Sequence, residues 1–380
     1  MTSTGDHLRV AWLGHRSSKL AGGMATYSAE ITSGLRSRGH QVTFFTLKTG
    51  DDGNLADPTM ETVGLEAMPL LRPLVISGRG AKRTLVDSLT AHDFDIVHAS
   101  FWFSSLDFDL PKTCRRLGIP LVATFHVAFD HRVSVWGGLT SATYRLYAPT
   151  LAKCDRVIVF GEAQRDILAT LGVPRKVLRI LPNGVDIQRY APGPSDWKSR
   201  LGGAEQLFVY MGRVDSEKGV DALLHAFLAV DPPATTRLVV VGQGSERRRL
   251  QRQYRDSRVI FTGHLADADE RIGILRAADA FFLSSQVEGL SLSMLEAMAC
   301  GLATVATDVG GDGDALRGAG ILIDPTNLAP QLEGVLRMLI DLPWLARPLG
   351  EEARRRAVER FSLTANIDTL VDLYREVGRG

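Results

Sequence analysis

The fold is decided by a repeating unit that is clearest in residues 206–230, QLFVYMGRVDSEKGVDALLHAFLAV. The first seven residues form an apolar run typical of a buried strand, and Val220–Val230 has the apolar spacing of an amphipathic helix. A loop that contains Arg213, Lys218 and Gly219 joins them. A strand that leads through such a loop into a helix is the building unit of a parallel sheet covered by helices on both faces.

The same order of apolar run, loop and helix recurs on both sides of this segment. The other apolar runs are Leu8–Gly14, Gln41–Leu47, Asp95–His98, Leu121–Phe125, Arg156–Phe160, Arg237–Gly242, Val259–Thr262, Ala280–Ser284 and Ala303–Thr307. Between the two groups, Leu181–Pro194 holds three prolines and two glycines, which interrupt the pattern. We therefore expect two α/β domains joined near residues 184–195, followed by one or two polar helices in Leu349–Gly380.

The composition bounds the classes of function. The chain has 380 residues, 45% of them apolar, and its 44 basic and 43 acidic side chains give no reason to expect a nucleic-acid partner. Three cysteines far apart argue against a disulfide framework or a zinc site, and favour a reducing compartment. The polar start lacks a signal core, and no window approaches the roughly 18 apolar residues of a membrane span. We expect a cytoplasmic protein.

Two cations stand where a ligand is expected. In open parallel sheets, ligands bind beyond the carboxyl ends of the strands, and two such sheets facing each other would form a cleft. Arg213 and Lys218 lie five residues apart in the loop after one strand, beside the start of a helix. Two fixed cations at such a place are suited to clamp a diphosphate. A surface loop with solvated charges fits the same spacing.

Two acids flank the start of another helix. Glu288 follows a buried strand, and Glu296 falls eight residues later on the next helix. Backbone N–H groups of residues 290–293 would face an anion there, and a carboxylate just inside the helix can accept hydrogen bonds from a sugar diol. Ser293 and Glu296 also have the spacing of a capping box, which is the structural alternative.

The first half of the chain offers weaker signals. Gly22 and Gly23 precede a helix, where they would let a phosphate or sugar approach the backbone. His126 follows the strand Leu121–Phe125 and could hydrogen-bond a sugar hydroxyl, although a lone histidine is more often structural and His98 has a similar position. Four Asp-x-Asp matches occur, but several are expected by chance among 43 acids, so no metal is assigned.

Taken in order, these features resemble the retaining glycosyltransferases of family 4, which have the GT-B fold. The matching segments are Gly22-Gly23, Asp95–His98, Thr124–His126, Leu181–Asp186, Gly212–Gly219, Val241–Gly244 and Glu288–Gly301. The resemblance implies an α/β fold of two Rossmann-like domains whose parallel sheets face each other across a cleft. It implies an acceptor-side domain in residues 1–185, a nucleotide-sugar-binding domain in residues 186–360, and a C-terminal helix, 361–380, that packs back on the first domain.

The resemblance also assigns roles to single residues. Arg213 and Lys218 match the pair that neutralises the donor diphosphate. Glu296 matches the acid that binds the ribose diol, and Glu288 matches the acid that holds hydroxyls of the transferred sugar. His126 matches the histidine that contacts this sugar from the first domain. The expected catalytic residues are therefore Glu288, His126, Arg213 and Lys218.

Further donor-binding positions follow from the same resemblance. Backbone N–H groups of Gly22 and Gly23 would approach the phosphate, and Leu265 falls where the nucleotide base packs. Backbone groups of Leu290, Ser291 and Leu292 would complete the phosphate site. The implied reaction is a metal-independent, retaining transfer of a hexosyl group from a nucleoside-diphosphate sugar to an acceptor hydroxyl, with no cofactor. The acceptor is an envelope glycan, a glycolipid or a small metabolite.

The chain departs from the common family pattern near the donor sugar. Leu290-Ser291 replaces an aromatic–glycine pair, and Asp312-Gly-Asp314 follows Gly310-Gly311 where a proline–glutamate pair is common. These departures leave the donor open. A nucleotide-sugar epimerase, a phosphorylase and an inactive sugar-nucleotide-binding subunit are the alternative functions.

One segment raises the question of a membrane partner. Residues 70–89 mix apolar and basic side chains, and residues 1–185 hold 21 Lys and Arg against 16 Asp and Glu. Such a segment can lie on an anionic membrane face as a peripheral contact. The alternative is a solvent-facing helix beside the acceptor site. The oligomeric state is left open.

Overall fold

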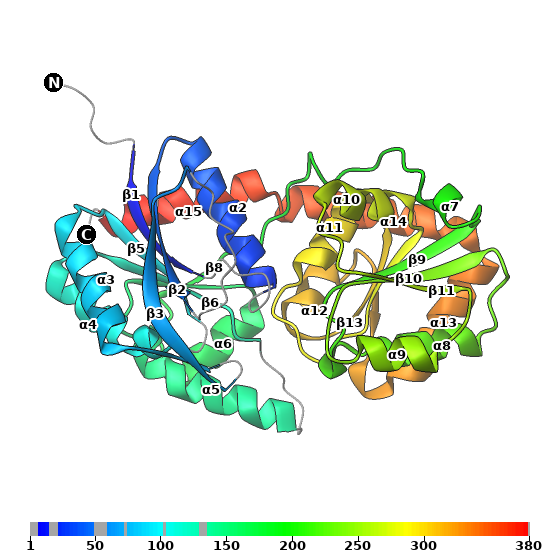
Figure 1. Cartoon of the computed structure of the whole chain (residues 1–380), viewed down its shortest axis with the longest axis horizontal. Coiled ribbons are helices and arrows are strands. Elements are labelled where there is room, and N and C mark those ends of the chain that lie inside the picture. The colour runs from blue at the N-terminus through cyan, green and yellow to red at the C-terminus, as the bar shows by residue number, and fades with distance from the viewer. Residues whose placement is uncertain are drawn as a thin grey trace. The chain divides into compact units, whose positions relative to one another are not determined.

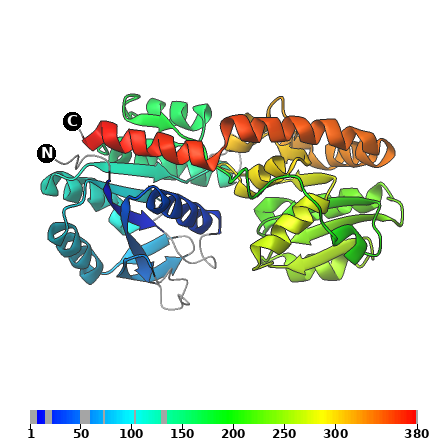
Figure 2. The same cartoon turned by 90° about the horizontal axis from the view of Figure 1, so that it is seen from above.

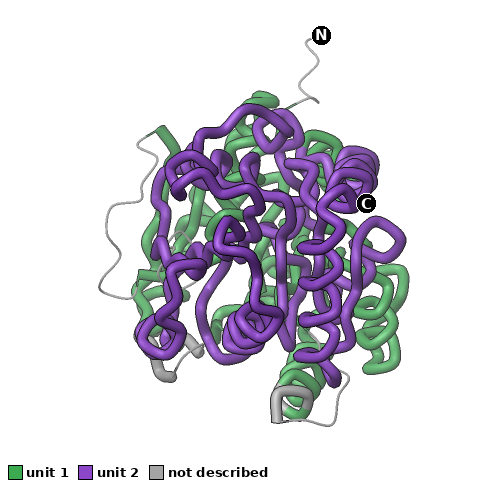
Figure 3. The backbone as a smooth tube through the Cα atoms, turned by 90° about the vertical axis from the view of Figure 1, so that its right-hand side faces the viewer, with its two compact units in different colours: residues 1–182, 364–380 green, residues 183–363 purple. Residues whose placement is uncertain are grey.

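The computed structural model describes residues 7–14, 22–48, 59–71, 74–101, 104–128 and 135–378. The chain divides into two compact units (Figure 3). Unit 1 comprises Met1–Pro182 with Thr364–Gly380, and unit 2 comprises Asn183–Leu363. The sequence places the corresponding boundaries at 185/186 and 360/361, within a few residues of these divisions.

Within its described residues, unit 1 is built on one sheet of eight strands. The strands are β1 (Arg9–Gly14), β2 (Gln41–Lys48), β3 (Thr62–Leu71), β4 (Leu74–Ser77), β5 (Ile96–Phe101), β6 (Leu121–Phe125), β7 (Arg156–Val159) and β8 (Leu178–Ile180). Their order across the sheet is β4-β3-β2-β1-β5-β6-β7-β8. Neighbouring strands pair in parallel, except that β3 and β4 pair antiparallel.

Helices cover both faces of this sheet (Figures 1 and 2). They are α2 (Gly23–Ser37), α3 (Arg79–Ala91), α4 (Ser105–Leu117), α5 (Val135–Leu151), α6 (Glu162–Thr170) and the C-terminal α15 (Leu363–Gly378). Helices α3 to α6 share one core with alternate strand residues such as Ala11 and Ala123. On the opposite face, Trp12 contacts Tyr27 of α2, with ring centroids 6.0 Å apart. Burial on both faces explains why the central strands read as unbroken apolar runs.

Helix α15 returns to unit 1 and is tied to it by side chains. Arg38 Nε, at the C-cap of α2, donates to Asp368 at 2.7 Å, and Arg156 donates to Glu376 at 2.5 Å. A Cβ on Gly34 would come within 2.1 Å of Ile367, so α2 and α15 approach closely at this glycine. The last helix of the chain is thus part of the first unit's layer of helices.

Unit 2, all of whose residues are described, has a six-stranded parallel sheet. Its strands are β9 (Gln206–Met211), β10 (Thr236–Val241), β11 (Val259–Gly263), β12 (Ala280–Leu283), β13 (Ala303–Thr307) and β14 (Ile321–Ile323). Its helices are α7 (Trp197–Arg200), α8 (Val220–Ala229), α9 (Arg247–Gln253), α10 (Ala268–Ala277), α11 (Leu292–Cys300), α12 (Gly310–Leu316), α13 (Leu328–Asp341) and α14 (Ala346–Arg360). The strand order is β11-β10-β9-β12-β13-β14.

Two parts of the sequence interpretation were incomplete. Strands β3, β4, β8 and β14 were not predicted. Residues 70–89 do not form one amphipathic helix, because β3 ends at Leu71, β4 covers Leu74–Ser77 and α3 begins only at Arg79. The strands that were predicted form contiguous parts of the two sheets, β2-β1-β5-β6-β7 and β11-β10-β9-β12-β13.

Candidate active site

The strand order of unit 2 has one switch point, between β9 and β12. From β9 the chain moves outward to β10 and β11, and from β12 it moves to β13 and β14. The two strands are neighbours, with Phe281 paired to Val209. The loops that follow them therefore leave the same edge of the sheet side by side, which is where open α/β sheets bind ligands.

Lys218 and Glu288 meet at this switch point. Lys218 belongs to the loop after β9, Glu288 to the loop after β12, and Lys218 Nζ lies 2.6 Å from Glu288 Oε1. Their side chains are only 12% and 15% exposed. The Ser285 hydroxyl donates to the same carboxylate oxygen at 2.8 Å. A partly buried acid and a partly buried cation, 70 residues apart in the sequence, thus face each other where a ligand is expected.

The two loops are fixed to each other through their backbones. Gln286 N donates to Glu217 O at 2.7 Å, and the Ser284 hydroxyl donates to the carbonyl oxygen of Gly219 at 2.9 Å. Gly219 has a φ of 63°, and a Cβ there would come within 2.2 Å of Ser284 O. Only glycine allows this approach, so the contact holds Lys218 in place against Glu288.

Arg213 lies in the same loop as Lys218 but is more exposed, at 57% of its side chain. Its guanidinium bonds Asp215 and, at 2.8 Å, Glu217. Burial opposes ionisation of Asp215, but hydrogen bonds from Ser245 and the charges of Arg213 and Lys218 outweigh it and lower the pKa of this carboxyl. The Asp215 carboxylate therefore interacts electrostatically with both cations. Both cations lie in the loop after β9, and each is paired with carboxylates of the chain itself.

Glu296 lies on α11 and interacts with Tyr190 and with the charges of two arginines. Burial raises the pKa of Glu296 to about 7, against a hydrogen bond with Tyr190 and the charges of Arg271 and Arg189, which lower it. Arg271 also donates to the carbonyl oxygen of Leu265 at 2.8 Å. The predicted ribose acid and the predicted base-packing residue are therefore linked through one arginine.

The capping-box interpretation of Glu296 is wrong. The N-cap of α11 is Ser291, whose hydroxyl accepts from Met294 N at 3.4 Å. Ser293 lies inside the helix and its hydroxyl is 3.1 Å from that of Ser291. Glu296 is therefore five residues beyond the cap and cannot complete a capping box, which pairs the cap with the third helical residue.

The loop between Glu288 and α11 is held by two residues that the spacing of motifs did not single out. The side-chain amide of Asn183 donates to Leu290 O at 2.7 Å, and Ser291 N donates to Asp312 Oδ1 at 2.6 Å. The Ser291 amide, predicted to face an anion, is thus bonded inside the protein. Both residues lie in segments noted in the sequence, but only the folded backbone shows which atoms they reach.

Unit 1 places its predicted residues at the carboxyl edge of its own sheet. Gly22, with a φ of 44°, is the N-cap of α2, and Gly23 is the first helical residue. His126 follows β6 and is partly exposed, with its ring 5.0 Å from that of Tyr27 on α2. Tyr27 therefore connects the glycine-started helix to His126 within this unit.

His98 has a structural environment. It is fully buried, stacks on Trp12 at 4.1 Å, and makes hydrogen bonds of 2.6 Å to Tyr374 Oη and 2.8 Å to Thr124 Oγ1. Burial, with a smaller contribution from His126, lowers the pKa of His98 to about 3. A neutral ring with both nitrogens bonded fits a core histidine, which separates it from His126.

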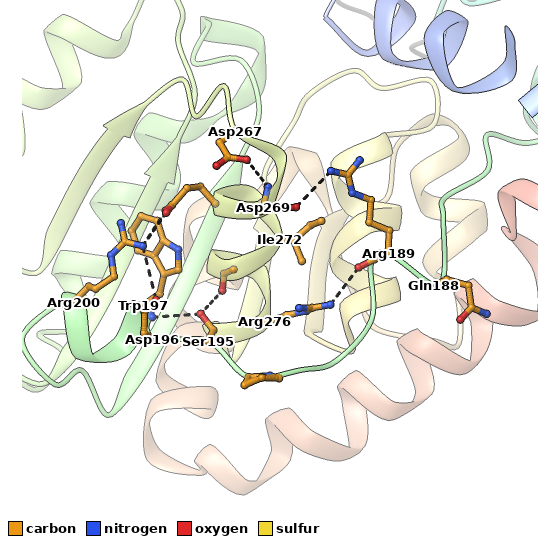
Figure 4. A pocket seen from close by; sticks show the side chains of 13 residues that line it. Gln188, Arg189, Ser195, Asp196, Trp197, Arg200, Asp267, Asp269, Ile272 and Arg276 are labelled. Carbon is orange, nitrogen blue, oxygen red and sulfur yellow. Dashed lines mark hydrogen bonds and ion pairs between the residues drawn. The ribbon is translucent and has the colours of Figure 1, made fainter. Parts of the chain in front are cut away.

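Unit 2 also contains a cavity of about 450 Å³ between α10 and residues 188–200 (Figure 4). Two arginines of its wall are bonded within the wall: Arg200 lies 2.9 Å from Glu270, and Arg276 donates to the backbone carbonyl of Ala191 at 2.8 Å. None of the predicted site residues lines it. This cavity is therefore separate from the Lys218–Glu288 pair.

Two features are absent from the described ranges. Among these residues, no group of three or more histidine, cysteine, aspartate or glutamate side chains is arranged to hold a metal ion. None of the described helices has the length and apolar character needed to cross a membrane.

Comparison with known proteins assigns both parts of the chain. A family model described as Glycosyltransferase Family 4 matches residues 21–189, and one described as Glycosyl transferases group 1 matches residues 205–341. The chain is 29% identical over 297 residues to a glycogen synthase of Mycobacterium tuberculosis, covering 75% of this chain and 70% of that one. It is 29% identical over 394 residues to a D-inositol 3-phosphate glycosyltransferase of Rhodococcus jostii, covering 93% and 84%.

The fold is shared with solved structures. Anabaena Alr3699/HepE in complex with UDP-glucose matches with a TM-score of 0.78 at 19% sequence identity. The match covers 97% of this chain and 100% of that chain. At this sequence identity, the similarity supports a shared fold of two parallel-sheet α/β domains.

Proposed function

Because the chain belongs to the GT-B glycosyltransferases, we propose that it transfers a hexosyl group from a nucleoside-diphosphate sugar to an acceptor hydroxyl, with retention of configuration and without a metal. The observation that carries the proposal is the Lys218–Glu288 pair at the switch point of unit 2. A nucleotide sugar presents a diphosphate joined to a sugar ring. A cation beside an acid suits these two parts, since the ammonium binds phosphate and the carboxylate accepts sugar hydroxyls.

In this proposal, donor binding breaks the contact between Lys218 and Glu288 and gives each of them a new partner. The phosphate oxygens replace Glu288 at Lys218 Nζ, and the released carboxylate accepts hydrogen bonds from hydroxyls of the sugar. Arg213, which is exposed in the same loop, breaks its contacts with Asp215 and Glu217 and binds the diphosphate as the second cation. The carboxylate of Glu296 accepts hydrogen bonds from the ribose diol. Because the ionised form of Glu296 is the one that binds the diol, donor binding is favoured above the Glu296 pKa of about 7.

The transfer step breaks the bond between the anomeric carbon and the diphosphate oxygen. The bonding electron pair goes to the leaving diphosphate, whose growing negative charge is stabilised by Lys218 and Arg213. Fixed cations in a poorly solvated site stabilise this charge more in the transition state than in the ground state. The acceptor oxygen attacks the same face of the sugar, and its proton passes to the leaving phosphate oxygen. His126 is assigned to a hydrogen bond with the transferred sugar.

The choice of donor is guided by the relatives. Solved structures of this fold contain UDP or UDP-glucose, and the relatives by sequence are named for glucan synthesis and for transfer to inositol 3-phosphate. We therefore place UDP-glucose first among the donors to be tested and a polyol phosphate first among the acceptors.

The test is a thermal-shift panel of UDP-, GDP-, ADP- and dTDP-sugars, followed by product analysis with and without acceptor. A true donor raises the melting temperature in proportion to its affinity and dose, and glycosylated product forms only with acceptor. An altered nucleotide sugar without acceptor would identify an epimerase, and a need for inorganic phosphate would identify a phosphorylase. Binding without turnover over a broad acceptor panel would support an inactive binding subunit.

A further inference from the structure

Two hydrogen-bond donors stand beside one point at the carboxyl edge of the unit 2 sheet. A Cβ built on Gly263, the last residue of β11, would lie 3.1 Å from Gln243 Nε2 and 3.5 Å from Arg247 Nη2. Gln243 belongs to the loop after β10, and Arg247 is the first residue of α9. Gln243 is exposed and Arg247 is partly exposed, so a ligand at this edge can reach both side chains.

Arg247 lacks the acceptor that a buried guanidinium nitrogen normally has. Its Nε is buried and makes no hydrogen bond to any residue in the described part of the chain, although buried polar atoms in folded proteins are nearly always paired. Arg249 on the same helix, by contrast, lies 2.7 Å from Glu246 and 2.9 Å from Asp221. A guanidinium and an amide nitrogen can only donate, so a group that binds beside them has to supply acceptor atoms.

The loop that carries Gln243 is fixed to the loop after β9, which carries the two proposed diphosphate cations. Val214 N donates to Gln243 O at 2.9 Å. Asp215 Oδ1 accepts from the backbone N and the hydroxyl of Ser245 at 2.8 and 2.9 Å. A Cβ on Gly244 would come within 2.1 Å of Val214 O, so the two backbones are in direct contact. The two donors therefore have a fixed place relative to the diphosphate site.

The strand order sets the direction in which a bound donor extends. A nucleotide sugar consists of a sugar, a diphosphate, a ribose and a base in that order. In the proposed function the sugar lies at Glu288, after β12, and the diphosphate lies at Lys218, after the neighbouring β9. The nucleoside then continues toward β10 and β11, which lie about 5 and 10 Å beyond β9. Leu265, the residue at which the base is expected to pack, follows Gly263 by two residues.

We propose that Arg247 and Gln243 bind the nucleobase of the donor and select a base with a carbonyl oxygen over one with an amino group at the same ring position. The inference rests on the proposed function, because it requires the donor diphosphate at Lys218. Uracil and guanine present a carbonyl oxygen where cytosine and adenine carry an amino group. An amino group placed against these side chains leaves donors without an acceptor, and a site built around a hydrogen bond rejects the analogue that cannot form it.

The test is calorimetric titration of the full-length protein with two matched pairs of nucleotide sugars. The pairs are UDP-glucose with CDP-glucose and GDP-glucose with ADP-glucose. Within a pair the ring system is the same, and the first member carries the carbonyl oxygen where the second carries the amino group. In the pair that contains the stronger ligand, we expect the carbonyl member to bind at least about tenfold more tightly, the effect of one charge-assisted hydrogen bond.

Variants separate recognition of the base from a general effect of charge. Arg247→Met removes the donors and keeps an unbranched side chain, so affinity for the carbonyl member should fall about tenfold and affinity for the amino member less than twofold. Gln243→Glu replaces the amide donor by an acceptor beside Arg247 and should reduce the same preference. Arg248→Met, which changes the next and exposed arginine of α9, is the matched control and should keep the wild-type preference. Loss of charge alone would weaken both members of a pair equally.

Three results would overturn the inference while leaving the proposed function intact. The first is equal affinity for the two members of each pair in the wild type, and the second is a preference for the amino member. The third is an Arg247→Met protein that keeps the wild-type ratio of affinities, whether or not both affinities fall. Failure of every nucleotide sugar to bind the wild type would instead refute the proposed function, and the inference with it.

Discussion

Replacing Lys218 by alanine separates its contribution to stability from its proposed part in the chemistry. Its ammonium lies 2.6 Å from Glu288, and the two side chains are 12% and 15% exposed. Removing one partner of a fully buried ion pair costs about 3–5 kcal/mol. Because this pair keeps some exposure and Glu288 keeps the hydrogen bond from Ser285, we expect the free energy of unfolding to fall by about 2 kcal/mol at pH 7.

The effect on transfer should be larger and separable. Loss of one group that stabilises charge in the transition state lowers kcat by about 10²–10³, or roughly 3–4 kcal/mol. The double variant Lys218→Ala, Glu288→Gln removes the unpaired carboxylate, so we expect it to regain most of the lost stability. It should regain no activity, because the cation that grips the diphosphate is still missing.

The assay combines urea unfolding, followed by circular dichroism, with initial rates at saturating donor and acceptor. Lys198→Ala is the matched control, because Lys198 pairs with Asp279 at 2.8 Å elsewhere in unit 2 and has no proposed contact with donor. A decrease of less than threefold in kcat for folded Lys218→Ala would refute the reasoning. So would recovery of activity in the double variant, since stability alone would then explain the loss.

Three further outcomes are expected. Glu296→Gln should raise the donor KM, and an unchanged KM would contradict its ribose role. Because burial raises the pKa of Glu296 from 4.5 to about 7, the wild type must bury an ionised carboxylate on folding at pH 8 but a neutral acid at pH 4, so the variant should raise the melting temperature at pH 8 and not at pH 4. Gly219→Ala should destabilise the protein by more than about 1 kcal/mol in urea unfolding, because its Cβ would collide with Ser284 O at a positive φ; equal stability would contradict the rigid loop contact. Asn183→Leu removes the hydrogen bond to the Leu290 carbonyl and should raise the donor KM more than it lowers kcat in steady-state kinetics. A loss of kcat with an unchanged KM would show that this hydrogen bond does not position the donor.

The parts of the fold that could be predicted are those buried on both faces. Strand β9 reads as an unbroken apolar run because helices cover both sides of its sheet. Strand β3 was missed because it is partly exposed and its sequence contains glycine, glutamate and proline, which weaken the apolar signal. Strand β14 has only three residues at a sheet edge, too few for a periodic pattern.

Site residues could be predicted where a charged side chain lies in the loop directly after a predicted strand. Lys218 and Glu288 stand in loops after strands, and the topology brings those loops together at the switch point. Their roles in binding a donor stay predictions. The parts played by Asp312 and Asn183 depend on which backbone atoms of Leu290–Ser291 they reach, and this follows from the glycine contacts of α12 rather than from any spacing of residues.

The most direct measurement is a crystal structure of the protein with UDP-glucose or with the sugar nucleotide that the thermal-shift panel selects. The proposed function predicts Lys218 Nζ within about 2.7–2.9 Å of a phosphate oxygen next to the sugar, with its contact to Glu288 broken and the carboxylate on a sugar hydroxyl. A bound donor whose diphosphate lies elsewhere, with the Lys218–Glu288 pair still intact, would contradict the account.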